Sequence, residues 1–252
     1  MRGREQNHSA PLVPEWLILG KNPLLMGLFG AMLDFLFPLR CEGCGREGAY
    51  LCEMCLYALP RARAAREPWI AAIYEYRSPA VQGALWKLKY RGVADIAGLF
   101  GKILYDLARL NFAPQNLGGR ALLDVAEKDA LKNHGKISLV PVPLSERKAR
   151  ERGYNQAELL ARAMAREDAE GLFSLELALL ARTKDGRSQM SIRDRSAREA
   201  NVRGAFAAHE TAKGRRIVLV DDIATTGATL RAARDALLAA GAREVTAVVV
   251  AH

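Results

Sequence analysis

Two adjacent carboxylates follow an apolar run near the end of the sequence. In RRIVLVDDIATTGATLRAA, residues 215–233, the apolar residues 217–220 precede Asp221 and Asp222. Neighbouring carboxylates repel each other unless a hydrogen-bond donor or a positive charge lies beside them. The pair therefore implies a ligand at this point of the fold.

The loop after the acidic pair has the composition of an anion site. Its small residues leave backbone N–H groups accessible, and its threonines add hydroxyl donors in front of an expected helix N-terminus, which favours phosphate. The carboxylates cannot hold a phosphate, but they suit the hydroxyls of a polyol or a hydrated Mg²⁺. A phosphate site beside a polyol or metal site describes a sugar phosphate. The loop residues are Thr225, Thr226, Gly227, Ala228 and Thr229.

All four cysteines fall within one short segment, CEGCGREGAYLCEMC. They form two C-x2-C pairs separated by seven residues, a spacing typical of two turns that direct four thiolates at one Zn²⁺. Gly43 and Gly45 provide the permissive backbone that such turns need. The alternative is two disulfides, which belong to exported proteins, and no export signal is recognised here. Four thiolates leave no open coordination position, so we predict a structural zinc site made of Cys41, Cys44, Cys52 and Cys55.

The charge balance indicates an anionic partner. The chain of 252 residues has 37 Lys and Arg against 28 Asp and Glu, a formal net charge of +9. An excess of this size suits nucleic acid, membrane headgroups or a phosphorylated small molecule. The aromatic residues do not interleave with the basic runs, as a base-stacking platform would require, and this favours a small molecule.

The first 40 residues are apolar, but their charges interrupt any span long enough to cross a bilayer. Lys21 and Asp34 leave twelve uncharged residues between them, whereas a spanning helix needs about 18 to 20. We therefore expect an amphipathic helical segment over residues 1–40, no stable membrane insertion and a cytoplasmic location.

The rest of the chain alternates between two kinds of hydrophobic pattern. Continuous apolar runs bounded by turn residues predict strands, and apolar residues at helical spacing predict helices. Strands are expected over 69–76, 136–143, 175–183, 204–210, 216–222 and 244–252. Helices are expected over 79–92, 94–110, 155–167, 191–201 and 228–240.

Two helix starts carry specific signals. Ser78 and Pro79 provide a cap and a first helical residue, and Asn155 with Glu158 forms a capping box. Strands alternating with helices predict an α/β fold with a mostly parallel sheet covered on both faces. Ligands of such sheets bind at the carboxyl ends of the strands, which is where the acidic pair is expected.

Other phosphate-binding folds fit the sequence less well. A receiver domain needs a phospho-acceptor aspartate far beyond its acidic pair, and the only later aspartate, Asp235, falls inside an expected helix. A P-loop needs a lysine after its glycine, which TTGATL lacks. The single G-x-G-x-x-G, residues 43–48, lies within the cysteine segment with no strand before it. A strand that ends in two solvated acids is the plain alternative.

Several motifs resemble one known family. IVLVDDIATTGATL, residues 217–230, resembles the phosphoribosyl pyrophosphate (PRPP) signature of type I phosphoribosyltransferases. From about residue 41 to the end the chain is similar to the ComF family of competence-related proteins, and residues 141–230 are also similar to the transferase half of glutamine PRPP amidotransferase. The motifs that carry the ComF resemblance are the cysteine segment, LKYRG (88–92), PVPLSERKARERGYNQAELLARA (141–163) and ARTKDGRSQMSIRDRSAREANVRGAF (181–206).

The resemblance implies a role for each part of the site. The acidic pair holds the ribose 2′ and 3′ hydroxyls, the following loop holds the 5′-phosphate, and residues 182–189 are similar to a flexible loop that closes over the sugar. Mg²⁺ is implied together with PRPP. The implied catalytic residues are Asp221, Asp222 and Lys184. The implied substrate-binding residues are Thr225, Thr226, Gly227, Ala228, Thr229, Arg147 and Arg152.

Two functions stay open from the sequence. One is an enzyme that transfers a phosphoribosyl group to or from a nitrogenous base, with PRPP or a related ribose phosphate as its ligand. The other is a non-catalytic PRPP- or nucleotide-binding protein in DNA uptake, with single-stranded DNA or a competence helicase as partner. Either is compatible with a homo-oligomer. The expected parts are the helical segment 1–40, a zinc-ribbon-like module over 41–60 and a type I phosphoribosyltransferase-like domain over 69–252.

Overall fold

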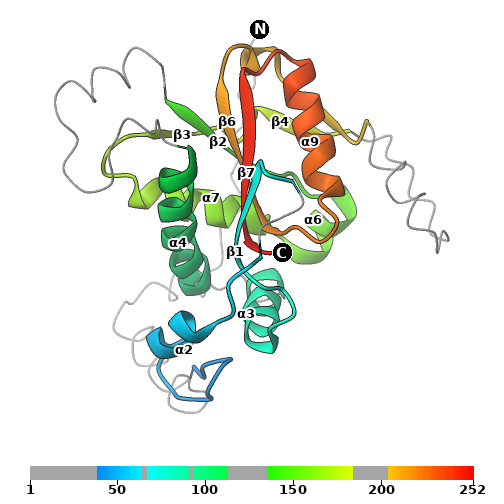
Figure 1. Cartoon of the computed structure of the whole chain (residues 1–252). Coiled ribbons are helices and arrows are strands. Elements are labelled where there is room, and N and C mark those ends of the chain that lie inside the picture. Colours follow the sequence, from blue (N-terminus) through cyan, green and yellow to red (C-terminus); the bar gives the residue numbers. More distant parts are fainter. Residues whose placement is uncertain (1–38, 64–66, 91–93, 113–135, 184–203) are drawn as a thin grey trace, which may run out of the picture.

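The computed structural model describes residues 39–63, 67–90, 94–112, 136–183 and 204–252 (Figure 1). Its centre is a five-stranded sheet in which all neighbouring strands are parallel, in the order β1-β7-β6-β2-β3. The expected α/β fold is thereby confirmed. The strands are β1 (Ile70–Tyr74), β2 (Ile137–Pro141), β3 (Phe173–Leu175), β6 (Arg216–Ile223) and β7 (Glu244–Ala251).

Helices cover both faces of the sheet (Figure 1). The helices α4 (Ala94–Phe112) and α7 (Gln156–Glu167) pack on one face, and α9 (Ala228–Ala239) packs on the other. A two-stranded antiparallel ribbon of β4 (Leu180–Arg182) and β5 (Phe206–Ala208) joins the core on the α9 face. Because all central strands but the short β1 and β3 are buried on both sides, their apolar runs are continuous rather than alternating.

Strand β6 shows how the two faces divide. Val218 and Val220 belong to the core under α4 and α7, whereas Ile217 and Leu219 belong to the core under α9. Successive side chains of a strand point to opposite faces. The strand continues through Ile223, one residue beyond the expected end at Asp222, so the acidic pair lies within the strand as predicted.

The contact between α4 and α7 depends on a glycine. A Cβ added at Gly101 would lie 2.3 Å from the Cβ of Ala163 and 3.1 Å from backbone atoms of α7. The two helices therefore approach each other at Gly101 more closely than any side chain would allow. This close packing sets the position of α7, whose N-terminus lies at the carboxyl edge of the sheet.

The cysteine module and α3 (Pro79–Tyr90) lie beyond the carboxyl ends of β1 and β7, near the C-terminus of the chain (Figure 1). The module contains the short helix α2 (Glu53–Ala58). Lys87 of α3 forms a 2.5 Å ion pair with Glu42 of the module, and its ammonium group lies 4.7 Å from the centre of the Tyr50 ring. The module is thus attached to α3, and the Tyr74 hydroxyl of β1 also donates to the Leu56 carbonyl of α2 at 3.5 Å.

Most expected elements are present, with three local corrections. Asn155 caps α7 as predicted, since its Oδ1 accepts from the Ala157 N–H at 3.0 Å, but the capping box is wrong because Glu158 pairs with Arg162. The expected strand 175–183 is two strands, β3 and β4, in different sheets. A seven-residue helix, α6 (Glu146–Arg152), which we had not predicted, follows β2. The expected helix 191–201 and nearly all of the segment 1–40 lie outside the described residues.

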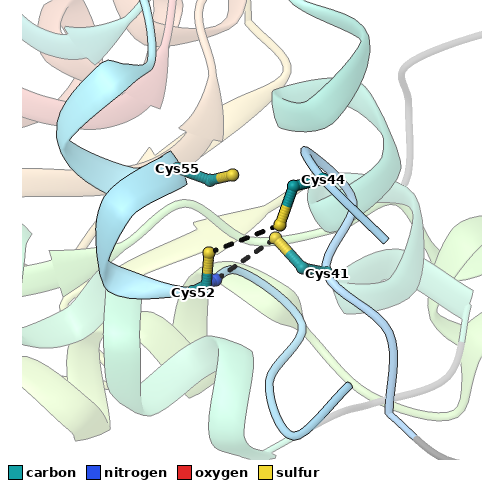
Figure 2. Close-up of side chains that lie close together, drawn as sticks. All are labelled: Cys41, Cys44, Cys52 and Cys55. Atoms are coloured by element: carbon teal, nitrogen blue, oxygen red, sulfur yellow. Dashed lines mark hydrogen bonds between the residues drawn. The ribbon is translucent and has the colours of Figure 1, made fainter. Parts of the chain in front are cut away.

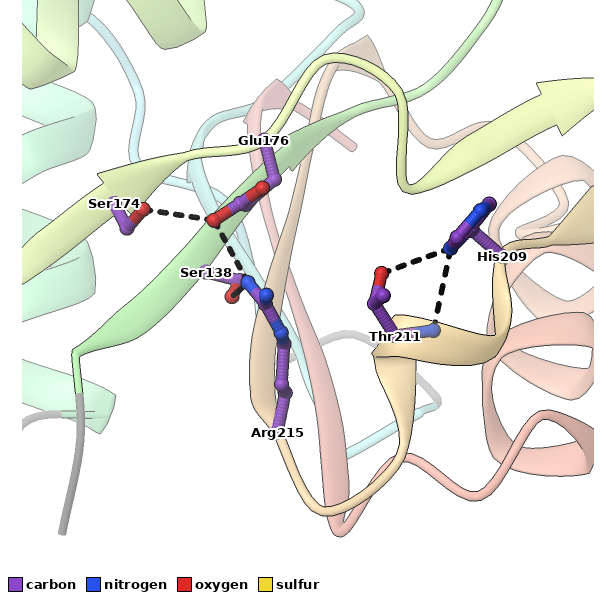
Figure 3. A network of polar contacts seen from close by, with 6 residues as sticks. All are labelled: Ser138, Ser174, Glu176, His209, Thr211 and Arg215. Carbon is purple, nitrogen blue, oxygen red and sulfur yellow. Dashed lines mark hydrogen bonds and ion pairs between the residues drawn. The ribbon is translucent and has the colours of Figure 1, made fainter.

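A polar network anchors β3 to the central strands (Figure 3). Arg215, just before β6, donates to Glu176 at 2.7 Å and to Ser138 at 3.3 Å, and Ser174 donates to the same Glu176 oxygen at 2.8 Å. Close by, His209 Nδ1 lies 3.0 Å from the Thr211 hydroxyl and caps a short 3-10 turn. Every charge in this network has a partner, so its role is structural.

The helices described here are all too short or too polar to cross a membrane. This finding concerns only the residues that the structure describes, so the expectation for residues 1–40 stays a prediction.

Candidate functional site

The acidic pair lies at the carboxyl end of β6, where we expected the site. Its two carboxylates lie close enough to interact, because both the charge and the side chain of Asp222 raise the pKa of Asp221. Asp222 pairs with Lys89 of α3, and the charge of Asp221 opposes the lowering of the Arg182 pKa by burial. The Asp221 carboxylate also accepts a hydrogen bond of 2.8 Å from the Asp222 N–H.

Asp222 has a partner that our reading of the sequence missed. Its Oδ2 lies 2.9 Å from the ammonium nitrogen of Lys89, the second residue of the LKYRG motif on α3. The Asp222 residue is only 6% exposed. This oxygen accepts no hydrogen bond of standard geometry among the described residues, so the ion pair is its only stabilising contact there. The positive charge that the acidic pair implied is therefore supplied, in part, by the chain itself.

Asp221 forms no ion pair of its own with a described residue, although the charge of Lys89 also acts on it. Burial raises the pKa of its carboxyl group well above the ordinary range, and the negative charge of Asp222 adds to the rise. The hydrogen bond from the Asp222 N–H opposes this shift without cancelling it. Asp221 is therefore the acid that gains most from a bound cation or from hydroxyl donors.

The loop between β6 and α9 has the form expected of an anion site. Gly227 caps α9 with a φ of +72°, in the left-handed region that other residues rarely adopt. Thr225 and Thr226 are exposed. Within the described part of the chain, no hydrogen bond uses the N–H groups of Thr225, Thr226 or Gly227. These three N–H groups and the first turn of α9 can therefore bind an anion.

The loop after β2 brings only one of its two predicted arginines to the site. Arg147 is exposed and pairs within α6 with Glu151, at 2.6 Å. Arg152, at the end of α6, lies with its guanidinium 5.4 Å from the centre of the Tyr90 ring. The predicted catalytic residue Lys184 lies outside the described residues. It comes after β4 and before β5 in the sequence, and both of these strands are described.

A pocket of about 500 Å³ opens beside the ion pair. Two rings of α3 line it, Trp86 and Tyr90, with centroids 5.5 Å apart. Aromatic and basic side chains therefore meet here, although the aromatic residues do not interleave with the basic runs along the sequence. Tyr154, of the ERGYNQ motif, holds the end of α3 in place by donating to the Leu88 carbonyl at 2.8 Å. The lining residues are Tyr76, Pro79, Gln82, Gly83, Leu85, Trp86, Lys89, Tyr90, Arg152 and Ile223.

The four cysteines converge as their spacing predicts (Figure 2). All four thiols are free, and their sulfur atoms lie within 4.8 Å of one another. Cys44 Sγ and Cys52 Sγ are 3.7 Å apart, close to the separation of about 3.8 Å that two thiolates have around one tetrahedral Zn²⁺. A disulfide needs about 2.05 Å, so this arrangement suits a metal and not a pair of disulfides.

Hydrogen bonds around the cluster favour a thiolate. Burial alone would raise the pKa of Cys41, but backbone N–H groups, with Cys52 the strongest donor, outweigh it and lower the pKa to about 6. Hydrogen bonds with the Cys52 and Cys44 side chains instead raise the pKa of Cys55 to about 12. Four thiols this close ionise together only when a cation neutralises them, so the donor set fits a metal ion.

The two glycines of the cluster serve different purposes. Gly45 has a φ of +73°, as a tight turn requires. Gly43 has no such backbone need, but a Cβ there would lie 2.7 Å from Cys55 Sγ. Gly43 is therefore required for space, and not for the permissive backbone that we expected at both positions.

Comparison with known proteins agrees with this geometry. Residues 152–252 match the Phosphoribosyl transferase domain. The DNA utilization protein YhgH of Escherichia coli K12 is 27% identical over 215 residues, which cover 81% of this chain and 80% of that protein. Competence protein ComFC of Bacillus subtilis is 35% identical over 103 residues, covering 41% of this chain and 39% of that one. The chain is therefore similar to competence and DNA utilization proteins, and its residues 152–252 are similar to phosphoribosyl transferases.

Among solved structures, this chain is similar to the glutamine PRPP amidotransferase of B. subtilis, complexed with ADP and GMP. The sequence identity is 19% and the TM-score is 0.36, and the match covers 65% of this chain and 30% of the amidotransferase chain. The match to the transferase domain begins at Arg152, so α3, Lys89 and the cysteine module lie before it. No signal in the sequence singles out Lys89, because Lys87 and Arg91 are basic residues beside it.

Proposed function

We propose that this ComF-like chain binds PRPP with Mg²⁺ and transfers its phosphoribosyl group to or from a nitrogenous base. One observation carries the proposal. In the described part of the chain, the backbone N–H groups of residues 225–227 donate no hydrogen bond. They follow Asp221 and Asp222 at the carboxyl edge of the sheet, within the residues that match the transferase domain. An anion site and two carboxylates at this spacing suit the 5′-phosphate and the hydroxyls of one ribose.

Each part of the site has a role in this proposal. The loop formed by Thr225, Thr226, Gly227, Ala228 and Thr229 holds the 5′-phosphate, and the two carboxylates accept from the ribose 2′ and 3′ hydroxyls. Arg152, and Arg147 after a change of partner, would face the diphosphate, and Lys184 belongs to the segment that would cover it. Mg²⁺, when bound, would lower the charge of the departing diphosphate.

The chemistry is a substitution at the anomeric carbon of the ribose. The bond from this carbon to the diphosphate oxygen breaks as a bond to the base nitrogen forms, and the base nitrogen then loses its proton. Positive charge develops on the ribose ring at the transition state, and Asp221 and Asp222 can stabilise it electrostatically. No described residue stands out as a general base, so the proton is transferred to solvent or to the diphosphate.

The same proposal includes one structural Zn²⁺ per chain, held by Cys41, Cys44, Cys52 and Cys55. It divides the chain into the module over 41–60 and the transferase domain over 69–252, preceded by the helical segment 1–40, and places the protein in the cytoplasm. Since Glu42 of the module pairs with Lys87 of α3, the zinc site would support the helix that carries Lys89.

The names of two relatives favour a second candidate function. These relatives are called a competence protein and a DNA utilization protein. The chain would then bind PRPP or a nucleotide without turnover and act in DNA uptake, with single-stranded DNA or a competence helicase as its partner.

Incubation of the pure protein with PRPP, Mg²⁺ and a panel of bases, while diphosphate release is followed, tests the first function. The variant with both Asp221→Asn and Asp222→Asn should lose PRPP affinity in calorimetry, because each lost charge-assisted bond is worth about 1.5–3 kcal/mol. Asp235→Asn, an exposed change on α9, is the matched control. PRPP binding without diphosphate release for any base would select the second function, and unchanged affinity in the double variant would refute both.

A further inference from the structure

The pocket beside the Asp222–Lys89 ion pair has features that the sugar-phosphate site alone does not use. We infer that it receives the base, and that this base is a planar ring bearing carbonyl oxygens or negative charge, such as an oxopurine or oxopyrimidine. The inference rests on the proposed function, because it assigns the acceptor side of the same site. The three observations behind it are the stacked rings, the hydrogen-bond donors of the lining and the position of the pocket.

The rings form a stacking surface. Trp86 and Tyr90 are four residues apart on α3, so they lie on one side of the helix, and they are 52% and 57% exposed. Their planes are tilted by 42°, and Arg152 lies over the Tyr90 ring. Large aromatic side chains are rarely this exposed beside a pocket unless a ligand covers them. A flat heterocycle can lie against them because every base has a π-face.

The hydrogen-bond donors of the lining distinguish among flat ligands. Lys89 and Arg152 bring N–H donors, although the charge of Lys89 is paired with Asp222, and none of the ten residues that line the pocket is acidic. Gln82 does not decide between ligands, because its Nε2 donates to the Tyr76 carbonyl at 3.0 Å and its Oε1 can accept from an amine. Cations and N–H donors attract ring carbonyls and ring anions, whereas they do not satisfy an exocyclic amine. The pocket therefore favours an oxo-substituted ring over an amino-substituted one.

The position of the pocket matches the reaction. Ile223, directly after Asp222, forms part of its wall, and Lys89 both lines it and pairs with Asp222. A base that reacts at the anomeric carbon must lie next to the ribose that the carboxylates hold. A pocket elsewhere on the surface could not serve as the acceptor site.

The size of the pocket separates a single base from a nucleic acid strand. Its volume of about 500 Å³ is within the usual range of about 300–1,000 Å³ for small-molecule sites. Proteins that follow a single strand stack successive bases on several aromatic side chains. A single pair of rings in one pocket instead suits one base.

Calorimetry with stable nucleotides tests the inference in the absence of turnover. Ribose 5-phosphate, IMP and AMP are titrated into the full chain with Mg²⁺, so that the affinity gained by adding a base is measured directly. We expect IMP to bind about 5-fold to 150-fold more tightly than ribose 5-phosphate, the range typical of one base stack. IMP and AMP differ in the oxygen or amine at one ring position, and IMP should bind more tightly.

Variants then locate the gain. Trp86→Leu should abolish the advantage of IMP while ribose 5-phosphate affinity is retained, and Trp86→Phe should keep most of the advantage. Tyr57→Leu, an equally conservative change of a 71% exposed ring on α2, should change nothing. Any one of three results would overturn the inference and leave the proposed function standing. They are equal affinities for IMP and ribose 5-phosphate, tighter binding of AMP than of IMP, and an advantage of IMP that persists in Trp86→Leu. Failure of ribose 5-phosphate and PRPP to bind at all would overturn the proposed function as well.

Titration with oligothymidylate, a single-stranded DNA, tests whether the two rings bind DNA instead of a single base. If it binds tightly, if Trp86→Leu removes that binding, and if IMP has no advantage over ribose 5-phosphate, the rings are a DNA platform and the inference is wrong. Weak oligothymidylate binding that Trp86→Leu leaves unchanged supports the single-base pocket.

Discussion

Replacing Lys89 by methionine should destabilise the protein through the carboxylate that it leaves behind. Lys89→Met keeps the length and apolar stem of the side chain but removes its charge. Asp222 would then be a carboxylate whose side chain is 8% exposed, with no counter-ion among the described residues. Lys89 itself is 21% exposed, so the two ends of this ion pair differ in their access to water.

The expected cost follows from the geometry. At 2.9 Å the two charges attract each other by about 6 kcal/mol at an effective dielectric constant of about 20, most of which offsets their loss of hydration. Removing one partner of a buried pair costs about 3–5 kcal/mol, and partial exposure of Lys89 puts Lys89→Met near 3 kcal/mol. Asp222→Asn should cost only about 1–2 kcal/mol, because the stranded ammonium can reach water.

Urea denaturation of four proteins measures this coupling. The wild type, Lys89→Met, Asp222→Asn and the double variant form a cycle, and the double variant should be more stable than the sum of the two single losses by about 1–3 kcal/mol. Lys102→Met, an exposed change on α4, is the control and should stay within about 0.5 kcal/mol of the wild type. If Lys89→Met costs no more than Lys102→Met, or if the two losses simply add, the ion pair does not stabilise the fold.

Three further predictions concern other parts of the molecule. Asp221→Asn should raise the melting temperature at neutral pH, since the folded-state pKa of Asp221 lies above its ordinary value and its ionisation therefore costs stability as pH rises; the gain should vanish toward about pH 4 in a thermal-shift series. Gly101→Ala should destabilise the fold by about 1–3 kcal/mol because its Cβ would overlap Ala163, whereas Gly98→Ala in the same helix, with open space around it, should stabilise by about 0.5–1 kcal/mol in urea. Elemental analysis should find one zinc per chain, and less in Gly43→Ala, whose Cβ would lie against Cys55 Sγ.

Each of these predictions has a clear contrary result. A pH-independent gain for Asp221→Asn would mean that Asp221 does not titrate abnormally. Equal effects of the two alanine substitutions would show that α4 and α7 do not meet closely at Gly101. A metal-free preparation whose four thiols all react in the folded state would exclude the zinc site.

Features that depend on neighbours along the chain are predictable from the sequence. The apolar run 217–220 followed by Gly227 predicts β6, a turn and α9, because strand and helix periods and a left-handed glycine are local properties. The spacing of the cysteines predicts their convergence because two tight turns suffice to bring the sulfur atoms together. Asn155 predicts the start of α7 because its side chain caps a helix within two residues.

Only the tertiary structure decided contacts between distant segments. Lys89 and Asp222 meet because α3 crosses the carboxyl edge of the sheet, and no local pattern in LKYRG specifies that partner. The stack of Arg152 on Tyr90 likewise joins α6 to α3. The division of residues 175–183 between β3 and β4 was also missed, since an apolar run does not say with which sheet it will pair.

The acidic pair shows both sides of this division. Its presence at the end of a buried strand is evident in the sequence, and so is the need for a partner, because two adjacent carboxylates repel each other. The geometry of the pair depends on the strand continuing through Ile223 and on the Asp222 N–H, which donates to the Asp221 carboxylate. Which of them receives a cation from the chain depends on the packing of α3, because electrostatic attraction acts over a few ångströms in space regardless of separation along the sequence.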